Sequence, residues 1–228
     1  MRSTSETAQA LLQPAQLIPL LHIENLQDAV PLARTFVEAG LPVIEVGLRT
    51  HAAQDAIGKI AAEVPGAIPI AGNVMTAHDL SIARRAGAKL ATSPGAPDDV
   101  MEAASQEGFP FVPGIATPTE LMHVLRMGYH VVKFFPAVPF GGAGALRAML
   151  APFPRALFIP TGGTGEGEYD EWLSLPNVIA IGGAWLAPRQ DIEAQRWDHI
   201  GLRARYAVSK FHAYRPVYAE EGLVAGRY

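Results

Sequence analysis

Short apolar runs alternate with helix-like stretches along almost the whole chain, and this regularity limits the possible folds more than any other property of the sequence. Eight runs rich in β-branched and aromatic residues begin 20 to 27 residues apart. One strand, a loop, a helix and a second loop need about this length, so the spacing indicates eight βα units. The runs are Leu17–Ile23, Val43–Leu48, Pro69–Val74, Leu90–Pro94, Phe111–Ile115, Val131–Phe135, Phe158–Gly162 and Ile179–Gly183.

The stretches between the runs contain helix signals. Three of them end just before a glycine, which readily adopts the left-handed conformation that follows many helices. These three are Ala29–Ala39, Thr76–Ala86 and Thr117–Met127. We therefore predict an α/β fold, a (β/α)₈ TIM barrel, with a leading helix at about Ser3–Leu12 that closes its bottom. A doubly wound open sheet is the alternative, which the lack of G-x-G-x-x-G after the first strand disfavours.

The length of 228 residues is compatible with one barrel domain. We predict a single domain over residues 1–228, with a core at about 10–205 and a C-terminal extension at 206–228. The predicted last helical stretch is Asp191–Val208. The aromatic residues beyond it predict an extension that packs on the barrel or on a neighbouring subunit, and they are Phe211, Tyr214, Tyr218 and Tyr228.

Composition excludes several classes of function. The 18 Lys and Arg against 22 Asp and Glu leave a net charge of −4, so no basic field would attract nucleic acid. The absence of Cys excludes disulfides and thiolate metal sites, and it fits a reducing cytoplasm. No apolar stretch approaches the roughly 20 residues of a membrane span, and the seven His residues lack metal-ligand spacing. We expect a cytoplasmic protein with no metal and with no nucleic-acid or membrane partner.

Lys133 stands at the end of an apolar run, and the carboxyl ends of barrel strands form the active site. A charged ammonium is costly to bury, so burial favours the neutral amine. A neutral amine can attack a carbonyl carbon and form a Schiff base. The alternative is a Lys whose flexible stem carries the ammonium out to water.

Glu45, Gly47 and Arg49 alternate along one predicted strand and so share one face. They would point into the mouth of the barrel, with Gly47 leaving space between the two charged side chains. Arg suits planar recognition of a carboxylate, and Glu beside an amine suits proton transfer. The alternative is an internal ion pair that only stabilises the barrel.

Glycine pairs end the seventh and eighth runs, in Thr161-Gly162-Gly163 and Gly182-Gly183-Ala184. Backbone N–H groups at these two positions often hold a phosphate in such barrels. Tight strand-to-helix turns would explain the same glycines equally well.

A set of short motifs resembles the bacterial KHG/KDPG aldolases, in order and at matching spacing over about residues 10 to 205. The motifs are Glu-Val-x-Leu-Arg-Thr at 45–50, Ser-Pro-Gly at 93–95, Pro-Gly-Ile at 113–115, Lys-Phe-Phe-Pro-Ala at 133–137, Pro-Thr-Gly-Gly at 160–163 and Ile-Gly-Gly-x-Trp-Leu at 181–186. The resemblance implies a class I aldolase, usually a homotrimer, that needs no cofactor. It would cleave 2-keto-3-deoxy-6-phosphogluconate to pyruvate and glyceraldehyde 3-phosphate, and also 4-hydroxy-2-oxoglutarate to pyruvate and glyoxylate.

The resemblance also implies roles for the residues that match family motifs. Lys133 would form the Schiff base, Glu45 would move protons, and Arg49 would hold the pyruvyl carboxylate. The other matching positions would contact the rest of the substrate: Pro94 and Phe135 as walls around the enamine, Thr161 as a substrate contact, and Gly162, Gly163 and Gly183 as the phosphate cradle.

Two positions and one loop depart from the family pattern. Asn73 stands where the family usually has a Thr that contacts the pyruvyl end, and Ala184 stands where a Ser often binds phosphate. Loss of one such hydrogen bond is worth about 1–3 kcal/mol. Glu166 and Glu168 add negative charge near the predicted phosphate loop.

These departures leave alternatives open. The first is the same aldol cleavage of an unphosphorylated 2-keto-3-deoxy acid. The second is a phosphate-binding barrel isomerase or synthase that uses Glu45 as a base without a covalent step. The third is a non-catalytic binding protein on the same scaffold.

Overall fold

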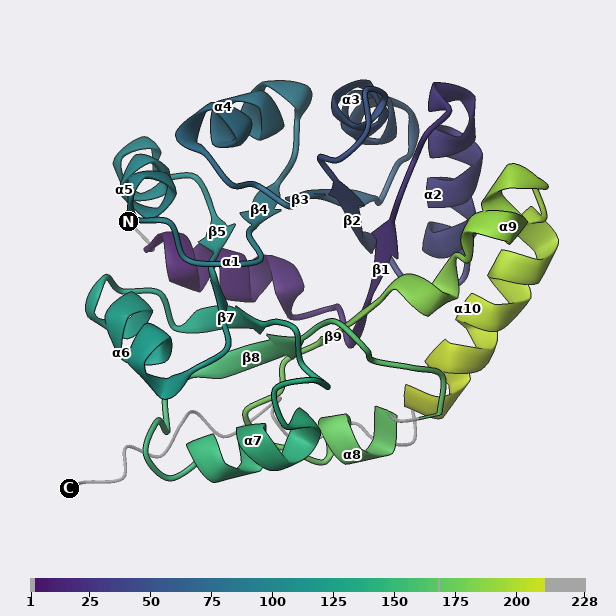
Figure 1. Cartoon of the computed structure of the whole chain (residues 1–228). Coiled ribbons are helices and arrows are strands. Elements are labelled where there is room, and N and C mark those ends of the chain that lie inside the picture. Colours follow the sequence, from purple (N-terminus) through teal and green to yellow (C-terminus); the bar gives the residue numbers. More distant parts are fainter. Residues whose placement is uncertain (1–2, 168, 212–228) are drawn as a thin grey trace.

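The computed structural model describes residues 3–167 and 169–211 as an α/β fold in which every strand pair is parallel. Six strands form a curved sheet in the order β5-β4-β3-β2-β1-β9, and three more form a sheet in the order β6-β7-β8. In Figure 1 the first helix crosses the middle of the ring of strands, and the other helices lie around the outside. The strands are β1 Leu17–Leu21, β2 Val43–Gly47, β3 Ile68–Gly72, β4 Leu90–Thr92, β5 Phe111–Val112, β6 Gly114–Ile115, β7 Val131–Phe134, β8 Leu157–Pro160 and β9 Ile181–Gly183.

Most of the α-helices connect one strand to the next, whereas one precedes β1 and two follow β9, and their apolar faces cover the strands. Two short 3₁₀ turns, η1 Leu26–Asp28 and η2 Ala184–Leu186, follow β1 and β9. The α-helices are α1 Thr4–Leu12, α2 Ala29–Glu38, α3 Ala53–Glu63, α4 Ala77–Ala86, α5 Asp98–Glu107, α6 Pro118–Arg126, α7 Gly142–Met149, α8 Tyr169–Leu173, α9 Arg189–Glu193 and α10 Trp197–Phe211. In the described ranges, no helix is both long enough and apolar enough to cross a bilayer.

Each of the eight predicted runs contains a strand, but the fifth is interrupted. Pro113 has no N–H to donate, and it separates β5 from β6. The two fragments pair with different neighbours, β5 with β4 and β6 with β7. The chain therefore passes from one sheet to the other at this proline.

The three predicted glycine stops are confirmed. Gly40, Gly87 and Gly128 follow α2, α4 and α6 with φ of 89°, 92° and 89°. The predicted single stretch Asp191–Val208 is wrong, because Gln195 has a φ of 49° and separates α9 from α10. Tyr214, Tyr218 and Tyr228 lie outside the described residues, so the packing of the extension stays a prediction.

A separate apolar cluster fills the space among the amino-terminal halves of the strands. It combines Ala8 and Leu12 of α1 with inward-facing strand residues such as Ile18 and Val43. The Ser5 hydroxyl on α1 accepts a hydrogen bond of 2.9 Å from the His130 N–H, just before β7. Because α1 covers these amino-terminal halves, the carboxyl ends of the strands remain available for a site.

Tyr129 gives a test of the packing between α5 and the start of β7. Its side chain is 1% exposed, and its hydroxyl donates a 2.6 Å hydrogen bond to the Met101 carbonyl. Burial raises the pKa of Tyr129 from 10.0 to about 12. The buried neutral phenol therefore stabilises the fold fully below pH 10.0, and this contribution is lost as pH rises through about 12.

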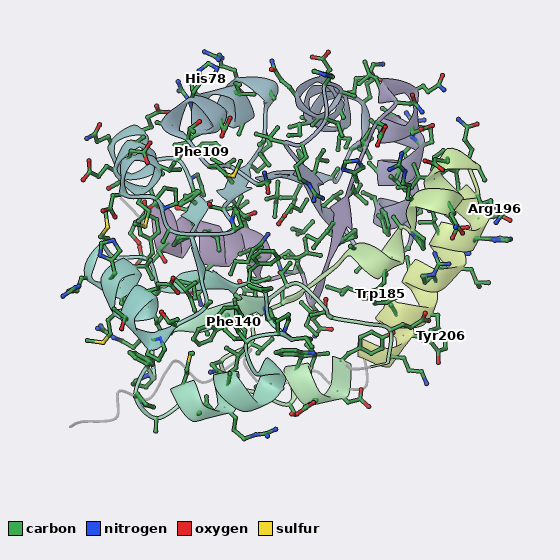
Figure 2. The ribbon with its side chains drawn as sticks, viewed as in Figure 1. His78, Phe109, Phe140, Trp185, Arg196 and Tyr206 are labelled. Carbon is green, nitrogen blue, oxygen red and sulfur yellow. The ribbon has the colours of Figure 1, made fainter. Side chains whose placement is uncertain are left out.

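We expect Tyr129→Phe to lower the free energy of unfolding at neutral pH by about 0.5–1.5 kcal/mol, because the Met101 carbonyl loses its donor. Urea unfolding measures the change. Tyr206 is 51% exposed on the outer face of α10 and provides the control (Figure 2). Tyr206→Phe should change stability little, and equal effects of the two substitutions would contradict the assigned role of the buried hydroxyl.

Candidate active site

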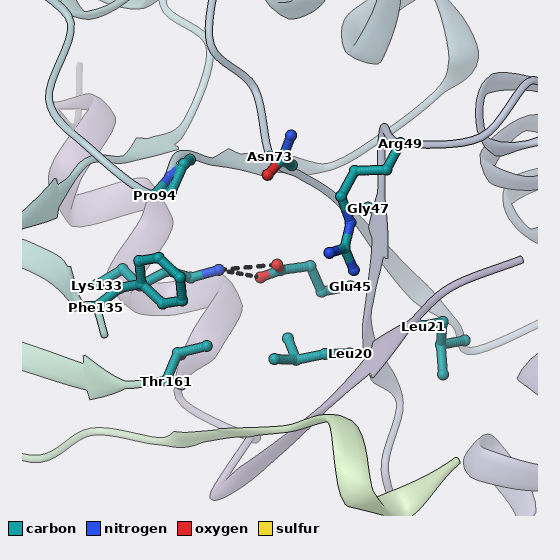
Figure 3. A pocket seen from close by; sticks show the side chains of 10 residues that line it. All are labelled: Leu20, Leu21, Glu45, Gly47, Arg49, Asn73, Pro94, Lys133, Phe135 and Thr161. Carbon is teal, nitrogen blue, oxygen red and sulfur yellow. Dashed lines mark hydrogen bonds and ion pairs between the residues drawn. The ribbon is translucent and has the colours of Figure 1, made fainter. Parts of the chain in front are cut away.

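A cavity of about 110 Å³ opens at the carboxyl ends of the strands. This volume is several times the roughly 30 Å³ that one water occupies, so the cavity can hold a small organic ligand. Its lining comes from strands or strand ends around the fold, and Figure 3 shows the polar side chains directed into it. The lining residues are Leu20, Leu21, Glu45, Gly47, Arg49, Asn73, Pro94, Lys133, Phe135 and Thr161.

Lys133 of β7 and Glu45 of β2 meet across the cavity (Figure 3). The Lys133 Nζ donates to both carboxylate oxygens of Glu45, at 2.8 Å and 2.9 Å. The two residues are 5% and 7% exposed. Lys133 therefore does not extend to water, and a proton can pass directly between the amine and the carboxylate in a largely dry site.

A third buried group, Thr92 at the end of β4, completes this cluster and was not predicted from the sequence. Its hydroxyl donates to Glu45 Oε2 at 3.1 Å and accepts from Lys133 Nζ at 3.1 Å. Period two places Thr92 on the same face of the strand as the inward-facing Leu90. The sequence did contain a signal for Thr92, because it is a polar residue at the carboxyl end of a strand and on the strand face that points inward.

Gly72 explains how a carboxylate on β2 can reach a hydroxyl on β4. Gly72 ends β3, which lies between these two strands. A Cβ atom at Gly72 would lie 2.7 Å from Glu45 Cδ and closer still to Oε1, so any side chain here overlaps the carboxylate. Glycine at this position lets the Glu45 side chain cross over β3.

We expect Gly72→Ala to lower kcat for the aldol cleavage that the sequence predicts by about 100-fold. The added methyl group would displace the Glu45 carboxylate, and a displacement of about 1 Å at a reacting group has an effect of that size. The backbone of Gly72 is not in the left-handed region, so the effect arises from crowding of Glu45. Steady-state kinetics with circular dichroism measures the change. Gly144→Ala on α7, where an added Cβ meets nothing within 4 Å, is the control. Wild-type kcat in folded Gly72→Ala would contradict this explanation.

Arg49 and Asn73 lie at the mouth of the cavity, each just after a strand. The prediction that Arg49 continues the strand is wrong, because β2 ends at Gly47. A tight turn, in which the Arg49 N–H donates to the Gly47 carbonyl at 2.8 Å, still directs the side chain inward. Asn73 has a φ of 61°, a left-handed conformation that Asn tolerates better than a β-branched residue. Its side chain lines the cavity (Figure 3).

Pro94 and Phe135, which the resemblance implies as walls, and Thr161, which it implies as a substrate contact, all line the cavity. Thr161 is 5% exposed and follows β8, and its hydroxyl donates a long 3.4 Å bond to the Ile159 carbonyl. Phe135 follows β7 and is 36% exposed. A Cβ at Gly162 would lie 3.0 Å from the Phe135 ring, so glycine allows the ring to pack on this loop.

The predicted phosphate residues adjoin the cavity but do not line it. Gly162 and Gly163 have φ of 93° and 84°, in the left-handed region. Gly183 ends β9, and Ala184 is exposed at the start of η2. These two segments lie together, because the Thr164 hydroxyl donates to the Gly182 carbonyl at 2.7 Å. The role of these residues as a phosphate cradle stays a prediction.

No cluster of three His, Asp or Glu side chains able to hold a metal ion occurs among residues 3–167 and 169–211. The charged groups at the cavity are those of Lys133, Glu45 and Arg49.

Comparison with known proteins shows the family of the chain. The family model for KDPG and KHG aldolase matches residues 8–202. A 2-dehydro-3-deoxy-phosphogluconate aldolase of Pseudoalteromonas atlantica is 44% identical over 203 residues, 89% of this chain and 94% of the relative. A KHG/KDPG aldolase of Escherichia coli is 41% identical over 208 residues, 91% of this chain and 98% of the relative.

Solved structures agree. A KDPG aldolase from Legionella pneumophila, with pyruvate captured as a covalent carbinolamine intermediate, has a TM-score of 0.85 and 37% identity and covers 87% of this chain and 97% of its own. A Zymomonas mobilis 2-keto-3-deoxy-6-phosphogluconate aldolase with 3-phosphoglycerate has a TM-score of 0.84 and 35% identity, covering 89% of this chain and 95% of its own. The resemblance predicted from the motifs is confirmed, and the chain belongs to the KDPG and KHG aldolase family.

Proposed function

We propose that this protein is a class I aldolase that cleaves 2-keto-3-deoxy-6-phosphogluconate to pyruvate and glyceraldehyde 3-phosphate, and also 4-hydroxy-2-oxoglutarate to pyruvate and glyoxylate. The observation that carries the proposal is the buried Lys133 amine bonded to both oxygens of Glu45. The covalent pyruvate intermediate in the Legionella relative supports chemistry of this type.

Lys133 and Glu45 would perform the covalent steps. Transfer of a proton from Nζ to Glu45 leaves a neutral amine that attacks the C2 carbonyl of the keto acid. The resulting carbinolamine loses water with a proton from Glu45 and becomes an iminium. The iminium withdraws electrons, so the C3–C4 bond breaks as Glu45, directly or through a water, takes the proton of the C4 hydroxyl. The aldehyde departs, and the enamine is protonated and hydrolysed to pyruvate.

The residues at the mouth would orient the keto acid. The Arg49 guanidinium points into the cavity beside Glu45 and suits a planar carboxylate (Figure 3). Asn73 can donate a hydrogen bond to the same pyruvyl end. Pro94 and Phe135 would flank the enamine, and the Thr161 hydroxyl has only a long internal bond and is free to turn to the substrate.

Gly162, Gly163, Gly183 and Ala184 would hold the phosphate through backbone N–H groups. Ala184 has no hydroxyl to contribute, and Glu166 is exposed on the adjoining loop. These two observations favour a second candidate, the same cleavage of an unphosphorylated 2-keto-3-deoxy acid.

Comparison of 2-keto-3-deoxy-6-phosphogluconate with the unphosphorylated 2-keto-3-deoxy acid tests the proposal. We expect the protein to release pyruvate from both, and reduction of that pyruvate by lactate dehydrogenase measures the rate. A kcat/KM for the phosphorylated substrate at least about 10-fold higher supports a working phosphate cradle, since that ratio equals one ordinary hydrogen bond. The reverse ratio would favour the unphosphorylated acid, and pyruvate from neither would contradict the aldolase function.

We further propose a single domain over residues 1–228 in which the two sheets are parts of one closed (β/α)₈ barrel with α1 at its bottom. The bridge between Phe158 and Val178 supports closure beside β8, and the short Pro113 interruption supports it between β5 and β6. The family resemblance implies a homotrimer. The absence of Cys is compatible with a cytoplasmic location.

A further inference from the structure

The Thr92 hydroxyl is the third member of the buried cluster formed with Lys133 and Glu45. Thr92 is 1% exposed, and its Oγ1 lies 3.1 Å from both Glu45 Oε2 and Lys133 Nζ. A carboxylate only accepts hydrogen bonds and an ammonium only donates them. The directions are therefore fixed: the Thr92 proton points to Glu45, and a Thr92 lone pair faces Lys133.

Lys133 cannot hold Glu45 in this way throughout the reaction. As an ammonium, Nζ carries three N–H donors, and here they reach Glu45 Oε1, Glu45 Oε2 and Thr92 Oγ1. Nζ keeps one N–H in the iminium or the enamine, because its other bonds are to carbon. Glu45 therefore loses most of its hydrogen bonds from Lys133 at the stage when it must accept the C4 hydroxyl proton.

We propose that Thr92 is a positioning residue for Glu45, and that its hydroxyl keeps the carboxylate directed at the substrate while Lys133 is bound covalently. This inference rests on the proposed function. Thr92 does not line the cavity, so it acts through Glu45 and not on the substrate. Its backbone carbonyl accepts a separate 3.0 Å bond from the Val74 N–H, which substitution of the side chain leaves in place.

Thr92→Val removes the hydroxyl at nearly constant shape, and Thr92→Ser retains the hydroxyl with less volume. We expect Thr92→Val to lower kcat for aldol cleavage about 10- to 100-fold, the range for one hydrogen bond to a charged group. Exchange of the pyruvate methyl protons in D₂O, followed by NMR, should slow similarly. KM and the yield of the borohydride-trapped pyruvate adduct should stay within about twofold, because Lys133 is still present and Thr92 does not touch the keto acid.

The split between kcat and KM and the Ser variant separate positioning from packing. A hydroxyl that positions Glu45 acts on the proton-transfer steps, so kcat and methyl-proton exchange fall while KM does not. Thr92→Ser should restore most of kcat and of the exchange rate, because it keeps the hydroxyl that donates to Glu45. A hydroxyl that only fills space would give no such rescue, because Ser is smaller than Val.

Two comparisons keep the result interpretable. If Thr92→Val does not fold, comparison of Thr92→Ala with Thr92→Ser repeats the test, because these two small side chains also differ by one hydroxyl. Thr35→Val on α2, which removes a hydroxyl that donates to the Pro31 carbonyl, is the matched control and should leave kcat and the exchange rate unchanged. Wild-type kcat and exchange in Thr92→Val, or equal loss in Thr92→Ser, would overturn this inference alone. No pyruvate adduct on wild-type protein would overturn the proposed function and this inference with it.

Discussion

Replacement of Lys133 with Met is expected to lower kcat by about 10⁵-fold or more, because loss of a covalent nucleophile has effects of that size. Met has a similar length and no amine, so no Schiff base can form. The measurement is pyruvate release under saturating substrate, with borohydride trapping in parallel. Turnover within about 100-fold of the wild-type rate would exclude Lys133 as the nucleophile.

Lys133→Arg is the control that separates loss of the nucleophile from loss of the positive charge. Arg keeps the positive charge that compensates Glu45 in the buried site, but its guanidinium stays protonated and cannot attack a carbonyl. Lys133→Met removes one partner of a buried ion pair, which costs about 3–5 kcal/mol of stability. We expect equal loss of activity in both variants and a lower free energy of unfolding in Lys133→Met. Unequal activities would mean that the charge and not the nucleophile controls the rate.

Replacement of Glu45 with Gln is expected to lower kcat by about 10²- to 10⁴-fold, the usual contribution of a general acid–base group. Gln preserves the volume of the side chain and can still accept one hydrogen bond from Lys133, but it cannot accept or return a proton. Rapid-quench measurement should show that the pyruvate adduct still forms on Lys133, though more slowly. Cleavage should fall further than adduct formation, because it also needs removal of the C4 hydroxyl proton.

Glu63→Gln is the control for Glu45→Gln. Glu63 forms an exposed ion pair of 3.1 Å with Lys59 on α3, and neither residue lines the cavity. Exposed pairs contribute only about 0–1 kcal/mol to stability, so this substitution should leave both the fold and kcat unchanged. A kcat in Glu45→Gln as high as that of Glu63→Gln would contradict the assignment of Glu45 as the acid–base group.

The existence of the strands and the choice of Lys133 as a candidate residue could be predicted, because both depend on local sequence. Regular spacing of apolar runs predicts βα units, and a lone Lys in such a run predicts either a functional amine or a residue that extends to water. The sequence could not decide between these, because the choice depends on Glu45, which lies 88 positions away along the chain. Glu45 and Lys133 stand on strands of different sheets, and only the arrangement of the two sheets around the cavity brings them together.

Thr92 and Gly72 show why the remaining site residues were missed. A buried Thr at the end of a strand usually only packs against its neighbours. The proposed role of Thr92 depends on its hydrogen bonds to Glu45 and Lys133, which stand on other strands. Gly72 matters because Glu45 crosses over it, which requires knowledge of which strand lies between β2 and β4. The turn that carries Arg49 inward and the break at Gln195 are backbone conformations that residue type alone does not specify.

The most direct test of the central claim is to incubate the wild-type protein with pyruvate, add borohydride, and locate the product by peptide mass spectrometry. Hydride reduces the C=N bond to a stable secondary amine, which retains the carbon skeleton of pyruvate on the modified residue. We predict a single adduct on Lys133. Folded protein that gives no adduct, or an adduct on another lysine, would contradict the Schiff-base mechanism.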